Sequence, residues 1–130
     1  MNAPESKRMA LVITGDAQAG ALCCEVLPHY GLVVEWIRDG SGALSCLQQA
    51  EPDLIVLDLQ LPGVSGLEVL DFVRQNARLA VVPVFMLTAD VICVHLTGVR
   101  VAAELLKPVS RADLIDAISP MFPAGESPLP

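Results

Sequence analysis

The chain has 130 residues and 53% hydrophobic residues, which suits one domain and excludes an intrinsically disordered chain. The formal net charge of −7, with only 8 Lys and Arg, excludes the basic surface that duplex nucleic acid requires, so no direct nucleic-acid binding is expected. No apolar run approaches the roughly 20 residues of a membrane span, and residues 1–8 lack a signal-peptide core, so a cytoplasmic location without membrane contact is expected.

Strands are predicted where short apolar runs occur. Two of these runs, 54–57 and 81–87, are almost wholly apolar, which is typical of strands buried on both faces of a parallel sheet. The strands predicted in chain order are Met9–Thr14, Leu32–Ile37, Leu54–Leu57, Val81–Leu87 and Glu104–Leu106.

Helices are predicted between the strands, from apolar residues at helical spacing and from capping residues. The segment from Asp16 is helical and ends near residues 28–31, Ser41 is predicted to cap a second helix, and Ser110 caps the last one. Ser65 and Glu68 have the spacing of a capping box. A further short helix is expected over Asp90–Leu96. The residues expected on the inner faces are Leu22, Val26, Tyr30, Leu44, Leu47, Ala50, Leu67, Leu70, Val73, Leu114, Ala117 and Ile118.

The alternation of strand and helix, repeated five times, predicts a single-domain (βα)5 α/β fold. The expected sheet is parallel and doubly wound, with helices on both faces. Residues 1–8 are expected to form an N-terminal tail and residues 9–120 the domain. Residues 121–130 contain several prolines and are expected to form a C-terminal tail or the start of a linker.

Polar residues stand at four of the predicted strand ends. They are Asp58, Thr88, Lys107 and, after the first strand, the run Thr14-Gly15-Asp16. The carboxyl ends of parallel strands form the functional edge of such a sheet, so these side chains are expected to share a small site. A carboxylate can be a nucleophile toward a phosphoryl group, and an ammonium and a hydroxyl can hold the transferred oxygens. A divalent cation would offset the negative charge.

The cysteines and histidines show no metal-binding pattern. Cys23 and Cys24 are adjacent, and His29 and His95 do not have zinc-finger spacing. Reduced, buried thiols in the cytosol are the expectation.

Four segments, in order, resemble the response regulator receiver domain. Residues 52–68 (PDLIVLDLQLPGVSGLE) are similar to its phosphoacceptor strand, loop and third helix. Leu87-Thr88-Ala89 and Leu106-Lys107-Pro108 are similar to its other site motifs, and Asp39-Gly40 with Ala43-Leu44 to its second loop and helix. The resemblance covers roughly residues 9–120. It implies a flavodoxin-like sheet with strand order 2-1-3-4-5 and a role in two-component signal transduction, not in enzyme catalysis.

The resemblance also implies roles for individual residues. Asp58 would accept a phosphoryl group from a histidine kinase, a phosphotransfer protein or a small phosphodonor. Thr88 would meet a phosphoryl oxygen, and Lys107 would pair with the phosphoryl group and precede Pro108 through a cis peptide bond. Mg²⁺ would be held by Asp58, by the main-chain carbonyl of Gln60 and by acids after the first strand.

The sequence departs from the family pattern at three places. Thr14 and Gly15 occupy the positions of two acids, which removes two negative charges from the metal site. Asp16 follows one place later and could serve as a metal ligand or as the N-cap of the next helix. Glu104 replaces an aromatic residue, and the segment between Thr88 and Lys107 is shorter than usual.

Two functions are compatible with this pattern. One is a phosphorylatable receiver with a weakened or altered Mg²⁺ site. The alternative is a pseudo-receiver, a protein-binding module of the same fold that acts without phosphorylation. In either case the output is expected through an output partner or self-association at the face formed by Asp90–Leu96, Glu104–Leu106 and Ser110–Ile118. A small enzyme or flavin carrier has little support, since residues 14–20 contain only separated glycines.

Overall fold

The computed structural model describes residues 8–90 and 101–122. Most of the short helix expected over Asp90–Leu96 therefore lies outside the described residues. Within them, no helix combines the length and apolar character needed to cross a membrane. The elements in chain order are β1 (Arg8–Ile13), α1 (Ala17–Val26), the 3-10 helix η1 (Leu27–Tyr30), β2 (Leu32–Ile37), α2 (Gly40–Leu47), β3 (Leu54–Asp58), α3 (Gly66–Gln75), α4 (Ala77–Ala80), β4 (Val84–Thr88), β5 (Ala103–Leu106) and α6 (Arg111–Ile118).

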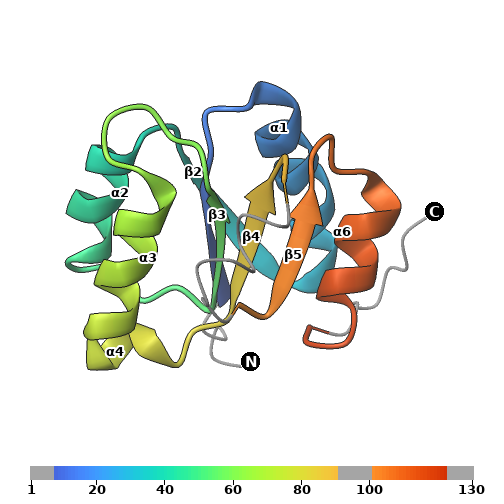
Figure 1. Cartoon of the computed structure of the whole chain (residues 1–130). Helices are drawn as coiled ribbons and strands as arrows, with labels where there is room; N and C mark the ends of the chain where they lie inside the picture. The colour runs from blue at the N-terminus through green and yellow to red at the C-terminus, as the bar shows by residue number, and fades with distance from the viewer. Residues whose placement is uncertain (1–7, 91–100, 123–130) are drawn as a thin grey trace, which may run out of the picture.

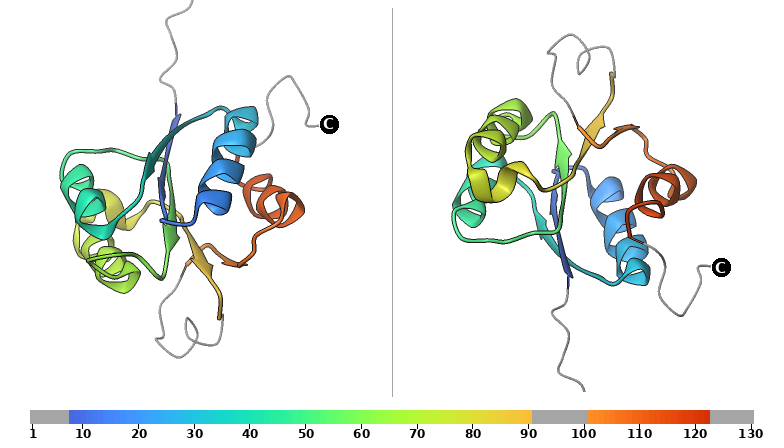
Figure 2. Two further views of the ribbon diagram at one scale, coloured as in Figure 1. Left: turned by 90° about the horizontal axis from the view of Figure 1, so that it is seen from above. Right: turned by 90° about the horizontal axis from the view of Figure 1, so that it is seen from below.

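The strands form one five-stranded sheet in the order β2-β1-β3-β4-β5 (Figure 1). Every neighbouring pair is parallel. Helices α1 and α6 cover one face of the sheet, and α2, α3 and α4 cover the other (Figure 2). The predicted doubly wound sheet and its strand order are confirmed.

The three central strands are buried on both faces because their apolar residues alternate between two core clusters. In β3, Leu54 and Val56 pack in the cluster beneath α1 and α6, while Ile55 and Leu57 pack in the cluster beneath α2 and α3. All four side chains are fully buried. Successive side chains of a strand point to opposite faces, so a wholly apolar run contributes apolar side chains to the core on both faces of the sheet.

The helix caps agree with the sequence at all but one position. Ser65 forms the predicted capping box and Ser110 caps α6. Helix α2, however, is capped by Asp39 and not by Ser41, because the Asp39 carboxylate accepts the backbone N–H of Gly42 at 2.6 Å. The helix begins one residue before Ser41, which lies in its first turn.

The largest difference from the predicted elements precedes β4. The sequence predicts a strand from Val81, but β4 begins at Val84 and Val81 is 84% exposed. A four-residue helix, α4, stands before it, and such a short element has no detectable apolar period. The guanidinium of Arg78 on α4 donates to the carbonyl oxygens of Leu47 and Gln48 at 2.8 and 3.2 Å, which joins α4 to the end of α2.

The inner faces of the helices agree less well with the sequence. On α3, Leu67 is 36% exposed, whereas Val69 is fully buried beside Leu70 and Val73. Leu67 lies three residues before Leu70, and Val69 lies four residues before Val73. Both spacings are helical, so the spacing alone does not decide which of Leu67 and Val69 is buried. Ala50, expected on the inner side of α2, lies beyond the end of that helix.

The core extends into the segment expected to be a C-terminal tail. Phe122 is only 7% exposed and packs in the cluster beneath α1 and α6. The guanidinium of Arg8 lies over its ring, 5.7 Å from the centroid. This contact joins the first residue of β1 to the end of the described chain.

The described cysteines are free thiols in different environments. Cys23 is buried, and burial with a smaller effect of Cys24 raises its pKa to about 12. Burial, then the nearby Glu35, raises the pKa of the half-buried Cys46. Cys24 is exposed, so among the cysteines that the structure describes the expectation of buried thiols holds fully only for Cys23. Cys93 lies outside the described residues.

Gly20 on α1 is required by the side chain of Trp36. A Cβ at position 20 would lie 2.0 Å from Cζ2 of the indole ring. We expect Gly20→Ala to lower the free energy of unfolding by about 2 kcal/mol, because a rigid ring has to move. In a Trp36→Ala background the same change should stabilise by about 0.8 kcal/mol, the helix propensity gain of Ala over Gly. Urea denaturation of the four proteins measures both values; destabilisation in both backgrounds would contradict this steric explanation.

Candidate functional site

The parallel sheet brings the predicted site residues to one edge. Thr14 directly follows β1, Asp58 and Thr88 end β3 and β4, and Lys107 directly follows β5. In the β1–β3 ladder Ile13 pairs with Leu57, so Thr14 and Asp58 are the next neighbours in register. Thr14, Asp58 and Thr88 are 0%, 1% and 2% exposed. A buried carboxylate at this position requires donors or a counter-ion.

Three donors hold the carboxylate of Asp58. Its Oδ2 accepts a hydrogen bond from the Thr14 hydroxyl at 2.6 Å and forms an ion pair with Lys107 Nζ at 2.7 Å. Its Oδ1 accepts the backbone N–H of Gln60 at 2.9 Å. The side chain of Lys107 is 18% exposed and that of Asp58 is 1% exposed, so solvent reaches the ion pair only from the Lys107 side. The arrangement fixes both carboxylate oxygens and balances the buried charge.

Each polar group of Thr14 forms a hydrogen bond. Its hydroxyl oxygen accepts the backbone N–H of Asp16 at 3.0 Å while its proton is directed to Asp58. Its backbone N–H donates to Ile37 at 3.0 Å, and its carbonyl oxygen accepts the indole N–H of Trp36 at 2.9 Å. The Arg38 guanidinium stacks on that indole, 3.9 Å from the ring centroid. The hydroxyl of Thr14 is thus directed at one oxygen of Asp58.

Asp16 is the N-cap of α1. Its Oδ1 accepts the backbone N–H groups of Gln18 and Ala19 at 3.0 and 3.3 Å. Of the two interpretations that the sequence leaves open for Asp16, the structure shows the capping one. The carboxylate is directed at the helix terminus, where it satisfies N–H groups that have no partner within the helix.

Thr88 follows Leu87, the residue that pairs with Asp58 in the sheet, but it makes its hydrogen bonds elsewhere. Its hydroxyl donates to the carbonyl oxygen of Asp90 at 3.1 Å and accepts the Asp90 N–H at 3.0 Å. The hydroxyl is therefore turned toward the segment that follows β4. The Lys107–Pro108 peptide bond is cis, as the resemblance implies.

The sequence identifies Asp58 and Lys107 as partners but misses the contribution of Thr14. Thr14 appears in the sequence as the loss of an acid, whereas in the structure it is a donor to Asp58. The register of two parallel strands that end in Thr14 and Asp58 could have indicated this contact. The link from Thr14 to Trp36 has no signal in the sequence.

Comparison with known proteins agrees with this geometry. The sequence model of the response regulator receiver domain matches residues 10–119. The chain belongs to the response regulator receiver domain family. The domain is 32% identical over 112 residues to the DNA-binding response regulator MtrA of Mycobacterium tuberculosis (strain ATCC 25618 / H37Rv). That match covers 84% of this chain and 48% of the relative, so the chain spans about half the length of the curated relatives it matches.

Solved structures show the same fold. The bacteriophytochrome response regulator RtBRR superposes on the receiver domain with a TM-score of 0.79 at 30% identity, covering 95% of this chain and 82% of that one. The receiver domain of sensor histidine kinase PA1611 from Pseudomonas aeruginosa PAO1 gives a TM-score of 0.77 at 21% identity, covering 90% of this chain and 98% of that one. The latter has a magnesium ion coordinated in its active-site cleft.

Receiver domains bind Mg²⁺ in their active sites, but the residues of this chain do not fit that ion. Mg²⁺ requires several oxygen ligands in near-octahedral geometry, usually including carboxylates. Across the described residues, no group of three or more His, Cys, Asp or Glu side chains is placed to hold a metal. Nor does any buried side-chain nitrogen or oxygen there lack a hydrogen-bond partner. Asp58 is satisfied by protein donors, and Asp16 caps α1.

Proposed function

We propose that the chain is a cytoplasmic two-component receiver that accepts a phosphoryl group on Asp58 inefficiently, because its metal site is altered, and that acts by binding another protein. One observation carries the proposal: the buried Asp58 carboxylate is paired with Lys107 at 2.7 Å, at the sheet edge where Thr88 also lies. A carboxylate with no chemical role could have been replaced by an apolar residue at little cost in stability. The histidine kinase or phosphotransfer protein of the pathway is the expected donor.

The proposed reaction is a phosphoryl transfer. An oxygen of Asp58 forms a bond to phosphorus, the bond from phosphorus to the donor's nitrogen or oxygen breaks, and its electron pair leaves with the donor. Oδ1 is the better nucleophile, since it accepts one hydrogen bond whereas Oδ2 accepts two. Lys107 then neutralises part of the charge on the transferred group.

The charge at the site limits the phosphorylated population. A bound phosphoryl group carries roughly two negative charges, and Lys107 supplies one positive charge. Since Thr14 and Gly15 provide no carboxylates, no divalent cation contributes to this balance. The acyl phosphate is therefore expected to form slowly and to reach a low steady-state level.

Thr88 is the proposed link from Asp58 to the rest of the domain. To donate to a phosphoryl oxygen, its hydroxyl has to release the carbonyl oxygen of Asp90. Phosphorylation would then shift the population of two states of the Thr88 hydroxyl, one bonded to Asp90 and one bonded to the phosphoryl group.

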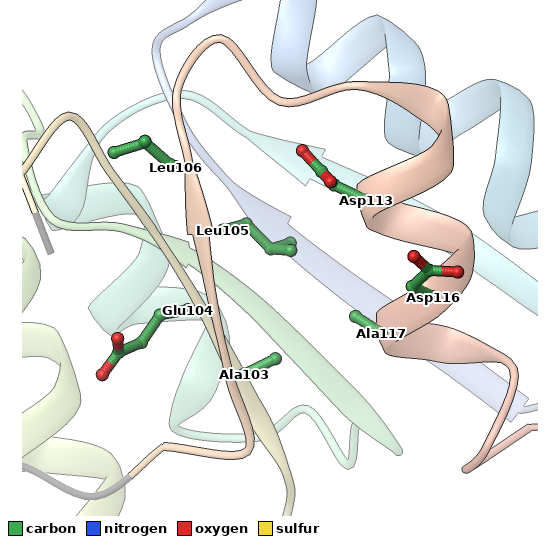
Figure 3. Close-up of a pocket in the computed structure, with 7 residues that line it drawn as sticks. All are labelled: Ala103, Glu104, Leu105, Leu106, Asp113, Asp116 and Ala117. Atoms are coloured by element: carbon green, nitrogen blue, oxygen red, sulfur yellow. The ribbon is translucent and has the colours of Figure 1, made fainter.

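The proposed output face includes β5 and α6. An open pocket of about 370 Å³ is lined by residues of both elements, among them Glu104, Asp113 and Asp116 (Figure 3). Figure 3 shows Glu104 and Leu106 on one side of β5 and Leu105 on the side of α6. Leu106 is 49% exposed, so the face offers apolar and acidic groups together. A protein partner or a second copy of the chain is the proposed occupant. The segment 91–100, also expected here, lies outside the described residues.

Phosphorylation of Asp58 is tested by intact-mass measurement after incubation with acetyl phosphate. We expect the wild type to gain the mass of one phosphoryl group in a minor fraction of molecules, and Asp58→Asn to gain none. Thr88→Val should reduce the wild-type fraction, because it removes one donor to the phosphoryl oxygens. An adduct of equal size on Asp58→Asn would place the acceptor elsewhere and refute the proposal.

A second candidate function is favoured by Thr14. Its hydroxyl satisfies Asp58 without a cation, which is the arrangement expected of a pseudo-receiver that binds its partner without phosphorylation. The mass measurement separates the two functions, since a pseudo-receiver gives no adduct with any donor, including a phosphorylated histidine kinase.

A further inference from the structure

We infer that Thr14 is a positioning residue that takes the place of a divalent cation, so that Asp58 is held in its resting geometry without Mg²⁺. The observation is the 2.6 Å hydrogen bond from the Thr14 hydroxyl to Asp58 Oδ2, next to the 2.7 Å contact with Lys107 Nζ. The inference rests on the proposed function only in naming Asp58 as the controlled carboxylate.

The register of the sheet explains why residue 14 decides the cation requirement. Ile13 pairs with Leu57 in the parallel β1–β3 ladder, so the next residue of each strand, Thr14 and Asp58, lie side by side. A carboxylate at position 14 would put two like charges in contact in a buried site, and a cation would be needed to hold both. A hydroxyl at the same position donates to the single carboxylate and removes that need.

The charges at the site disfavour binding of Mg²⁺. The charges of Asp58 and Lys107 cancel, and a divalent cation at Asp58 Oδ2 would lie close to the Lys107 ammonium. It would also displace the Thr14 hydroxyl, whose oxygen is already held by the Asp16 N–H. One carboxylate with two occupied oxygens cannot offset the cost of removing water from Mg²⁺.

The site nevertheless has room for the missing acids. A Cβ at Gly15 would lie 3.4 Å from the carbonyl oxygen of Arg38 and 3.6 Å from the Pro62 ring, which are ordinary contacts. The variant Thr14→Asp with Gly15→Asp is therefore expected to fold and to gain a cation site with Asp58. Thr14→Asn with Gly15→Asn is the matched control, with the same shape and no added charge.

The test is a titration of the full chain with MgCl₂ at constant ionic strength, followed by fluorescence and by thermal unfolding. Trp36 is the only tryptophan and donates to the Thr14 carbonyl, so its emission reports on this site. The wild type and the Asn control should show no saturable change in emission and no shift in Tm. The Asp variant should show a saturable change, with a rise in Tm of roughly 5 °C at a tenfold excess over Kd.

Saturable binding of Mg²⁺ to the wild type at millimolar concentration, abolished by Asp58→Asn, would overturn the inference. A folded Asp variant without any response would overturn the role given to residues 14 and 15. The wild-type titration is decisive even if the Asp variant fails to fold. A wild type that binds no Mg²⁺ and gains no phosphoryl group on Asp58 would support the inference. The same result would refute the proposed phosphorylation.

Discussion

Replacing Lys107 with Met should lower the free energy of unfolding by about 3 kcal/mol. The substitution keeps the length of the side chain but removes the ammonium that lies 2.7 Å from Asp58 Oδ2. Asp58 is 1% exposed, so its carboxylate would be left buried without a counter-ion, with only hydrogen-bond donors around it. Chemical denaturation monitored by circular dichroism measures the loss.

Two controls separate the buried pair from a general effect of charge. In an Asp58→Asn background, Lys107→Met should cost less than about 1 kcal/mol, since no buried charge remains to be compensated. The ion pair of Arg111 with Glu25 is exposed on both sides, so Arg111→Met should change stability by about 0.5 kcal/mol at most. Equal losses for Lys107→Met in the wild-type and Asp58→Asn backgrounds would show that the ion pair is not the cause.

Gly66→Ala should destabilise the domain by about 3 kcal/mol, although Ala is the better helix former. Gly66 is the first residue of α3, and a Cβ there would lie 2.2 Å from the carbonyl oxygen of Asp58 and 2.7 Å from the Cα of Leu59. Both contacts are with backbone, so no side chain can turn away to relieve them. The substitution would push α3 away from the strand end that carries Asp58.

Gly15→Ala is the matched control, because its nearest neighbour would be the Arg38 carbonyl oxygen at an ordinary 3.4 Å. It should change the unfolding free energy by less than about 1 kcal/mol. Urea denaturation gives both values, and the mass measurement with acetyl phosphate shows whether Gly66→Ala also lowers phosphorylation. A Gly66→Ala protein as stable as the wild type would mean that α3 is not packed on the Asp58 backbone as described.

The fold was accessible from the sequence because two signals agreed along the chain. Fully apolar runs such as 54–57 indicated strands buried on both faces, and capping residues such as Ser65 and Ser110 marked where helices begin. The strand order was implied by the resemblance to the receiver domain, and the structure has that order. Two predictions failed. The four residues of α4 are too short to show a helical pattern, and helical spacing did not distinguish Leu67 from Val69 on the inner face of α3.

The residues of the site were predictable, but most of their hydrogen-bond partners were not. Strand ends identified Asp58, Thr88 and Lys107, since parallel strands bring them to one edge. Capping was one of two roles that the sequence left open for Asp16, and the structure shows that role. The sequence could not show that Thr88 bonds to Asp90. These outcomes depend on which of several nearby backbone groups a short polar side chain meets, and residue spacing does not determine that.

In the proposed function, Asp58 controls the domain, and β5 and α6 respond to its phosphorylation. The most direct measurement is a pair of ¹H–¹⁵N NMR spectra of the labelled protein, before and after addition of acetyl phosphate. We expect a second, minor set of signals for Asp58, Thr88 and Lys107, with further shifts in β5 and α6, and none of these in Asp58→Asn. Unchanged spectra in the wild type, or the same changes in Asp58→Asn, would contradict this role of Asp58.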